Sequence, residues 1–136
     1  MQKYMVLIYN DPALLAAMPQ EEFNETMRGC LAKADELKTR GALLQSQMLE
    51  DVGTARTIRV RNGRKMITDG PFAESKEVLG GFNIIEAESM DEALLIAQSF
   101  PWADSGSIEV RPIRDIAAVA RRVGAPEGPA KKLQLT

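Results

Sequence analysis

Runs of apolar residues separated by turn-forming residues predict four strands, at residues 5–9, 42–48, 80–86 and 107–113. The first run stops at Asn10-Asp11-Pro12, and it is too short to be the apolar part of a signal peptide followed by a cleavage site. We therefore interpret it as a buried first strand.

Helical spacing characterises other stretches. Between Pro19 and Gly41 the apolar residues recur on one side of a predicted helix, as a stripe of Phe23, Met27, Cys30, Leu31, Ala34 and Leu37. Ser89 and Glu92 have the spacing of a capping box, which predicts a second helix that stops at Pro101. We also expect a helical turn within residues 12–18 and a short helix at residues 116–123.

Residues 56–68 form the clearest hairpin, because Asn62-Gly63 is a preferred pair for a two-residue turn. That turn places one apolar face, with Ile58, Val60 and Ile67, opposite a face that carries Arg59, Arg61 and Arg64. Like charges across a ladder repel each other, so the arginines must be solvated, paired with acids or used to hold an anion. The solvated alternative is the preferred interpretation.

The order strand, helix, strand, hairpin, strand, helix, strand predicts a ferredoxin-like α+β fold, in which helices cover one face of an antiparallel sheet. We expect one domain at residues 1–115, followed by a short helix and basic tail at residues 116–136. If the second face of the sheet is apolar, another subunit is its usual cover. The pattern therefore predicts a homodimer closed by its sheets.

Composition narrows the function classes. The 136 residues are 45% hydrophobic and 26% charged, with a net charge of −2, which suits one globular domain. The basic tail carries Lys131 and Lys132 but no aromatic residue, so nucleic-acid binding is not expected. No run approaches the length of a membrane span. Cys30 is the single cysteine, which favours a reducing cytoplasm and a small buried hydrophobe rather than a nucleophile.

Histidine is absent from the chain. This removes the usual general base near neutral pH, the commonest metal ligand, and every Ser-His or Cys-His nucleophile pair. We expect no cofactor and no transition metal, although oxygen-only sites for magnesium or calcium stay open.

The segment of residues 68–77 concentrates turn residues, acids and a lysine just before an apolar strand. Gly70-Pro71 predicts a tight turn that Asp69 caps with its carboxylate, and Phe72 is expected to fill the core. Glu74 and Lys76 follow the turn and are less easily explained as structure, although they could form a simple surface ion pair. Partly shielded from water, such a carboxylate would have a raised pKa and could move protons.

Two further residues are candidate ligand contacts. Arg111 near the end of the last strand could hold an anion, and Tyr9 at the end of the first could donate a hydrogen bond. Each has a structural alternative, as a surface pair or a rim aromatic. Asp69 is expected to be mainly structural, with Glu74 and Lys76 closer to function.

The sequence resembles the YCII-related superfamily, in the branch named for its DGPF motif. The residues that carry this resemblance are 5–9, 59–61, 68–77, 79–82 and 108–112, in the order of the family. The resemblance implies a dimeric α/β-barrel of ferredoxin-like subunits with pockets between sheet and helices. It implies no established activity. Relatives in the wider superfamily include a dechlorinating muconolactone enzyme and proteins with a proposed His-Asp pair. This chain cannot form that pair, because it has no histidine. Proteins of the DGPF type also resemble neighbours of extracytoplasmic sigma factors, which suggests a regulatory setting.

Two function classes follow. The first is a dimeric small-molecule-binding or regulatory module, for which a small acidic ligand is the candidate partner. The alternative is a cofactor-free isomerase, lyase or hydrolase that acts on a small acid, with Asp69 or Glu74 as acid/base and with Tyr9, Lys76 and Arg111 as ligand contacts. The missing histidine, metal cluster, nucleophile motif and phosphate loop favour the module, but the sequence leaves catalysis itself open.

Overall fold

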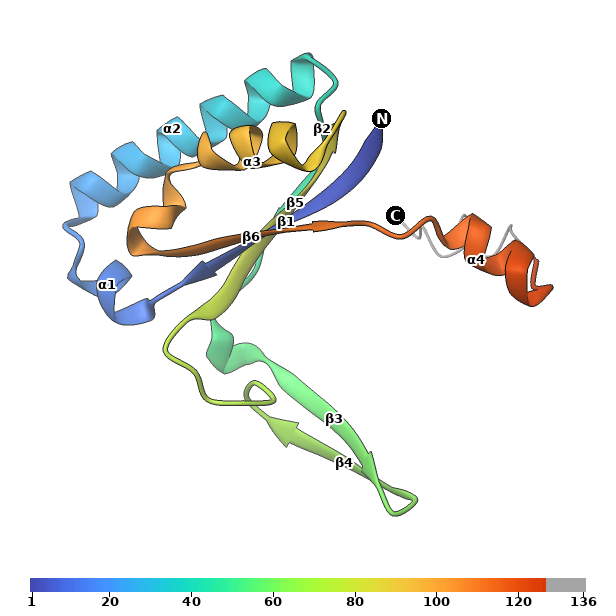
Figure 1. The fold of residues 1–136 in the computed structure, drawn as a ribbon. Helices are drawn as coiled ribbons and strands as arrows, with labels where there is room; N and C mark the ends of the chain where they lie inside the picture. The colour runs from blue at the N-terminus through green and yellow to red at the C-terminus, as the bar shows by residue number, and fades with distance from the viewer. Residues whose placement is uncertain (127–136) are drawn as a thin grey trace.

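The computed structural model describes residues 1–126, in which four strands form one antiparallel sheet in the order β2-β5-β1-β6 (Figure 1). These strands are β1 (Gln2–Asn10), β2 (Leu43–Met48), β5 (Val78–Ala87) and β6 (Gly106–Pro112). The central strand β1 pairs Val6 with Asn83 on one side and with Val110 on the other. All four predicted strands are confirmed, and β1 and β5 are longer than predicted.

The two long helices, α2 (Gln20–Thr39) and α3 (Met90–Gln98), cover the same face of this sheet (Figure 1). Ser89 accepts a hydrogen bond from the Glu92 amide at the start of α3, as the capping box predicts. Gly41, with a φ of 78°, follows the end of α2 in the left-handed conformation that glycine adopts readily. The helical predictions are therefore confirmed.

The described chain also contains two short helices and two 3-10 turns. The expected helical turn after the first strand is α1 (Pro12–Ala17), and the expected C-terminal helix is α4 (Ile116–Val123). The 3-10 turns are η1 (Val52–Thr54) and η2 (Pro101–Ser105). The predicted basic tail, with Lys131 and Lys132, lies outside the described residues.

The core lies between the helices and the sheet. Its three largest fully buried side chains are Val6 of β1, Ile85 of β5 and Leu37 of α2. Most of the predicted apolar stripe of α2 packs against this core, but Leu31 is 61% exposed. The chain thus has an α+β fold with one helix-covered sheet face.

The opposite sheet face has no covering layer within residues 1–126. Because side chains alternate along a strand, the half-buried residues Met5 and Leu7 of β1 point to this face, beside Ile84 and Phe82 of β5. The described residues do not close into a barrel. We call this surface the open face.

The hairpin of β3 (Arg56–Arg61) and β4 (Arg64–Asp69) is a separate two-stranded sheet that extends away from the four-stranded one (Figure 1). Its register pairs Arg61 with Arg64 across a turn at Asn62 and Gly63, both with positive φ. This matches the predicted turn and register. Its apolar face is largely exposed within the single chain: Ile58 is 69% exposed and Ile67 is 65% exposed.

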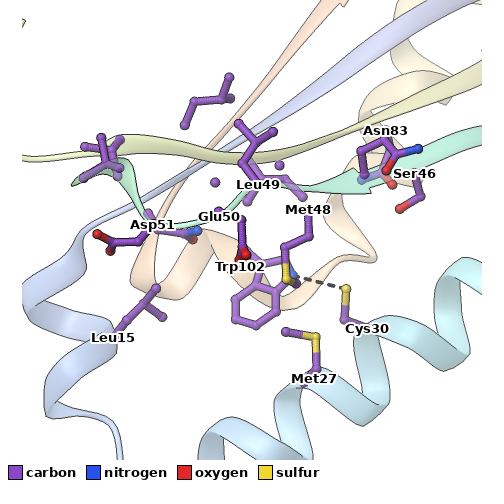
Figure 2. Close-up of a pocket in the computed structure, with 18 of the residues that line it drawn as sticks. Leu15, Met27, Cys30, Ser46, Met48, Leu49, Glu50, Asp51, Asn83 and Trp102 are labelled. Atoms are coloured by element: carbon purple, nitrogen blue, oxygen red, sulfur yellow. Dashed lines mark hydrogen bonds between the residues drawn. The ribbon is translucent and has the colours of Figure 1, made fainter. Parts of the chain in front are cut away.

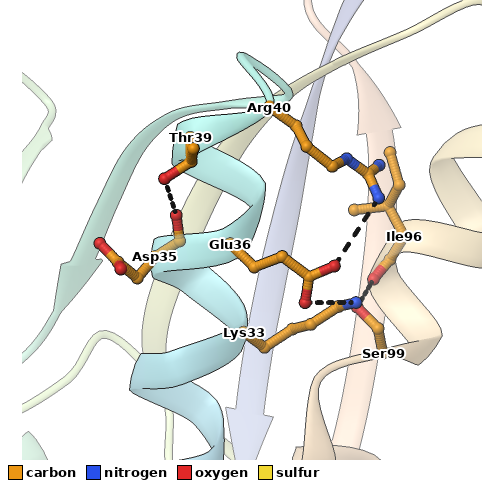
Figure 3. Close-up of polar contacts among 7 residues, drawn as sticks. All are labelled: Lys33, Asp35, Glu36, Thr39, Arg40, Ile96 and Ser99. Carbon is orange, nitrogen blue, oxygen red and sulfur yellow. Dashed lines mark hydrogen bonds and ion pairs between the residues drawn. The ribbon is translucent and has the colours of Figure 1, made fainter.

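Several charges on α2 have a structural explanation. Glu36 lies between two cations (Figure 3), with its carboxylate 3.3 Å from Lys33 Nζ and 4.0 Å from Arg40 Nη1. The Thr39 hydroxyl donates to the Asp35 carbonyl over 2.9 Å. These are partly exposed contacts within one helix, each typically worth well under 1 kcal/mol, so they stabilise α2 modestly and do not mark a site.

Candidate functional site

A cavity of about 610 Å³ lies between α2 and the four-stranded sheet (Figure 2). One wall is α2, with Met27 and Cys30, and another is the segment from Ser46 to Val52 that leaves β2. The ends of β1 and β5 form the third wall, and Leu15 of α1 and Trp102 of η2 complete the lining. The volume is in the range of small-molecule sites in proteins.

Glycines of β5 let the chain approach closely at one end of this cavity. Gly80 is the extra residue of a bulge, because Ile8 pairs with Gly81 while Tyr9 pairs with Leu79. A Cβ on Gly80 would lie 2.2 Å from Asn10 Nδ2, so the Asn10 amide occupies the space that a side chain would need. The bulge therefore positions Asn10 in the cavity wall.

Sulfur and aromatic groups make up the deep part of the wall. The Trp102 indole N–H donates to Cys30 Sγ over 3.2 Å, as Figure 2 shows. Phe23 and Trp102 have ring centroids 6.1 Å apart and planes tilted by 46°. Cys30 packs against the core as predicted, although it is only half-buried because it also lines the cavity.

Two amide oxygens in the wall lack hydrogen-bond partners among the described residues. The Oδ1 atoms of Asn10 and Asn83 are buried and unpaired among the described residues. Asn83 is only 3% exposed and lies in the middle of β5, on the face that carries the core residue Ile85. Buried polar groups are normally paired, so these two mark the wall as a polar contact point.

Sequence reasoning missed both asparagines. Asn83 interrupts an apolar strand at a position that alternates with Gly81 and Ile85, and this inward placement was the available signal. Asn10 gave no such signal, because it looks like part of a turn before Pro12.

The charged residues that line the cavity are both acidic. Glu50 and Asp51 line it and are exposed, and Asp51 already accepts a hydrogen bond from the Gly53 amide. The lining contains no lysine or arginine.

Asp69 lies outside the cavity, at the end of the hairpin. Its side chain is 90% exposed, and its carboxylate is 3.8 Å from Arg56 Nε. The predicted cap on the following turn is wrong. Instead, the Gly70 amide donates to the Ala55 carbonyl and the Thr57 hydroxyl donates to the Gly70 carbonyl.

Phe72 does not fill the core, contrary to expectation. It is 74% exposed, while its carbonyl accepts a hydrogen bond from the Arg59 guanidinium. The physical reason is the direction of the hairpin: because β3 and β4 extend away from the body, the chain after Gly70 returns along the outside of the molecule.

The rest of this loop, through Lys76 and Glu77, contacts residues at one end of the four-stranded sheet. Lys76 Nζ lies 4.0 Å from Asp11 Oδ2, and Glu77 Oε1 accepts a hydrogen bond of 2.7 Å from the Ser107 hydroxyl. Asp11 is buried and caps α1 through the Ala13 amide. Glu74 is exposed and forms no ion pair with Lys76. The loop thus makes structural contacts through Lys76 and Glu77.

Tyr9 and Arg111 lie on the open face, on the other side of the sheet from the cavity. The Tyr9 hydroxyl donates to Glu109 Oε1 over 3.3 Å. Burial raises the pKa of Tyr9 above its ordinary value of 10.0, the charge and hydrogen bond of Glu109 raise it further, and Arg111 opposes them. The structure therefore groups Tyr9 with Arg111 but places both apart from Asp69, Glu74 and the cavity.

Metal-ligand clusters and membrane-spanning helices are both missing from the part of the chain that the structure describes. Residues 1–126 contain no cluster of histidine, cysteine, aspartate and glutamate suited to a metal ion. Within the same residues, no helix has the length and apolar character needed to cross a membrane.

Comparison with known proteins adds two findings. The family model described as the YCII-related domain matches residues 2–117. An uncharacterised protein of Rhizobium meliloti (strain 1021) is 39% identical over 112 residues, which cover 81% of this chain and 90% of that protein. Neither description names an activity.

Proposed function

This chain belongs to the YCII-related family, and we propose that it is a dimeric module that binds a small molecule. The observation that carries the proposal is the cavity of about 610 Å³ between α2 and the sheet. Its lining is mainly apolar with a few polar groups, which is the usual composition of ligand sites.

Dimer formation is supported by two apolar surfaces that residues 1–126 leave without cover. One is the open face, with Leu7 and Phe82 side by side, and the other is the hairpin face, with Ile58 and Ile67. A two-stranded hairpin is marginally stable alone, and exposed apolar surfaces commonly mark interaction sites. We infer that a second copy covers both. In a two-fold symmetric dimer, the hairpin face of each copy can pack against the open face of the other.

The finer assignments belong to the same proposal. Without the hairpin, the order of two strand-helix-strand units and the sheet order β2-β5-β1-β6 fit a ferredoxin-like subunit of a dimeric α/β-barrel. Asp69-Gly70-Pro71-Phe72 supports the assignment of the chain to the DGPF branch. The single cysteine fits a regulatory or binding role in the cytoplasm.

The cofactor-free enzyme gains no support from the geometry. Asp69 and Glu74, the candidate acid/base residues, are both exposed and do not line the cavity. No nucleophile pair is available there, because Cys30 accepts its hydrogen bond from the Trp102 indole.

Two measurements test the proposal. Light scattering at micromolar concentration should give twice the chain mass, and a monomer mass would contradict the dimer. A thermal-shift screen of small aromatic and aliphatic compounds should raise the melting temperature with at least one class, since a ligand of the folded state stabilises it by mass action. A screen in which no compound shifts the melting temperature would contradict the binding role.

A further inference from the structure

The two unpaired amides define what kind of polar group the cavity can recognise. Asn10 and Asn83 each carry an acceptor and two donors, and Asn83 is almost completely buried. The terminal torsion of asparagine is broad, so a turn about its Cβ–Cγ bond presents either the oxygen or the NH₂ group to the cavity. Such a wall can pair with a ligand group that both donates and accepts hydrogen bonds.

The remaining wall suits an aromatic ring. Trp102 and Phe23 face Met27, Met48 and Cys30 around the same space. Thioether and thiol sulfur atoms make favourable contacts with aromatic rings, and tilted aromatic pairs accept a further ring edge to face.

The charges of the wall argue against an ionic ligand. A carboxylate bound beside Asn83 would find no lysine or arginine in the lining, and a buried charge without a partner is costly. Glu50 and Asp51 are exposed to water, which screens their attraction for a cation held beside the buried Asn83.

We propose that the cavity takes a neutral aromatic molecule that carries an amide or hydroxyl group, with Asn83 as its main polar contact and Asn10 as the second. This inference rests on the proposed binding function and narrows it. It differs from the acidic ligand expected from sequence, because the cations that suggested an acid, Lys76 and Arg111, do not line the cavity.

The experiment compares four polar or charged probes of nearly equal size, with toluene as a fifth, apolar control. Benzamide and benzyl alcohol are the neutral polar probes, benzoate is the anion and benzylammonium is the cation. The readout is the emission of Trp102, because it is the single tryptophan of the chain and lies in the cavity wall. We expect the neutral probes to bind at least about tenfold more tightly than benzoate and benzylammonium at pH 7. Benzoate or benzylammonium binding as tightly as benzamide would overturn the ligand class.

Asn83→Leu tests the polar contact. Replacing an unpaired buried acceptor with an apolar side chain of similar size is nearly neutral for folding, so the variant should keep its melting temperature. It should bind benzamide roughly fivefold more weakly while toluene binding is unchanged. Gln45→Leu is the matched control, because it removes an amide from β2 outside this cavity and should change neither affinity.

The outcomes separate this inference from the binding role. Unchanged benzamide affinity in Asn83→Leu, or in Asn83→Ala if the leucine variant does not fold, would overturn the role of the amide. If no probe changes Trp102 emission at about 10 mM, a concentration suited to such small fragments, the binding function fails together with the inference. If toluene or benzoate bound more tightly than benzamide, the small-molecule-binding function would stand, but the proposed class of neutral polar aromatic ligands would be wrong.

Discussion

The helix-covered side of the sheet and the hairpin use the same kinds of residue with opposite results. In the sheet, Val6 and Ile85 are both 0% exposed, whereas in the hairpin Ile58 is 69% and Ile67 is 65% exposed. The difference is a second layer: α2 and α3 cover the first region, and within residues 1–126 nothing covers the second. β-branched residues favour a strand in both places, but burial requires a facing element.

The hairpin is instead held at its base. Hydrogen bonds join the Thr57 hydroxyl to the Gly70 carbonyl and the Arg59 guanidinium to the Phe72 carbonyl. These contacts join the hairpin to the loop that follows it, in which Phe72 itself is 74% exposed. The comparison teaches that the helix-covered side of the sheet is packed within residues 1–126 and that the apolar face of the hairpin is not.

The largest expected effect tests the packing between the sheet and its covering helices. Ile85→Ala removes a fully buried side chain between sheet and helices and should lower the free energy of unfolding by about 2–5 kcal/mol. The matched Ile67→Ala change in the hairpin should cost clearly less in protein dilute enough to be monomeric, because Ile67 is 65% exposed in the single chain. Urea denaturation of both variants measures the difference, and equal losses would contradict the comparison.

The incompleteness of the hairpin predicts a concentration effect. Ile67→Asp places a charge on the apolar hairpin face and should weaken the proposed dimer at least about tenfold, because the charge would be buried on association. Light scattering over a dilution series measures this. Met66→Glu is the control, since Met66 pairs with Arg59 on the arginine face and should leave the dimer intact. A dimer that tolerates Ile67→Asp would show that another surface forms the contact.

Two aspartates sharpen the contrast further. Asp11→Ala should cost about 1 kcal/mol, because the buried carboxylate caps α1 in the body. Asp69→Ala should cost only a few tenths of a kcal/mol, because its ion pair with Arg56 is largely exposed. Thermal melts of the two variants decide the order. A larger loss for Asp69→Ala would restore the structural role that the sequence suggested.

The smallest effect concerns Tyr9 on the open face. Because its pKa is raised on folding, the protonated hydroxyl contributes stability that is fully present below pH 10 and is lost as the pH rises through the folded pKa. Glu109→Gln should lower this pKa toward 10, and Arg111→Gln should raise it further. NMR titration of ring-labelled tyrosine, assigned with Tyr9→Phe, measures both shifts. Shifts in the reverse directions would contradict the arrangement on this face.

Local signals made much of the fold predictable. Asn62-Gly63 specified the turn and register of the hairpin, and Ser89 specified the start of α3, because both depend on residues close in sequence.

The candidate site was less predictable because it depends on distances between elements. The volume beside α2 results from how the helix, the bulge at Gly80 and Trp102 pack together, and no short pattern encodes that. Phe72 was misplaced for a related reason: its burial depends on the direction in which the hairpin leaves the sheet. The five candidate residues were chosen for their chemistry, and their spatial grouping needed the tertiary structure.

The central position of β1 has a consequence for synthesis. Val6 pairs with Asn83 and with Val110, so both partners of the first strand are made late. At about 5–20 residues per second, a ribosome needs roughly 5–20 s to travel from Val6 to Val110. The hairpin can close within microseconds of its emergence. The apolar first strand, in contrast, has both edges unpaired until β5 has emerged and one edge unpaired until β6 has emerged, so we expect the nascent chain to need protection from aggregation during this time.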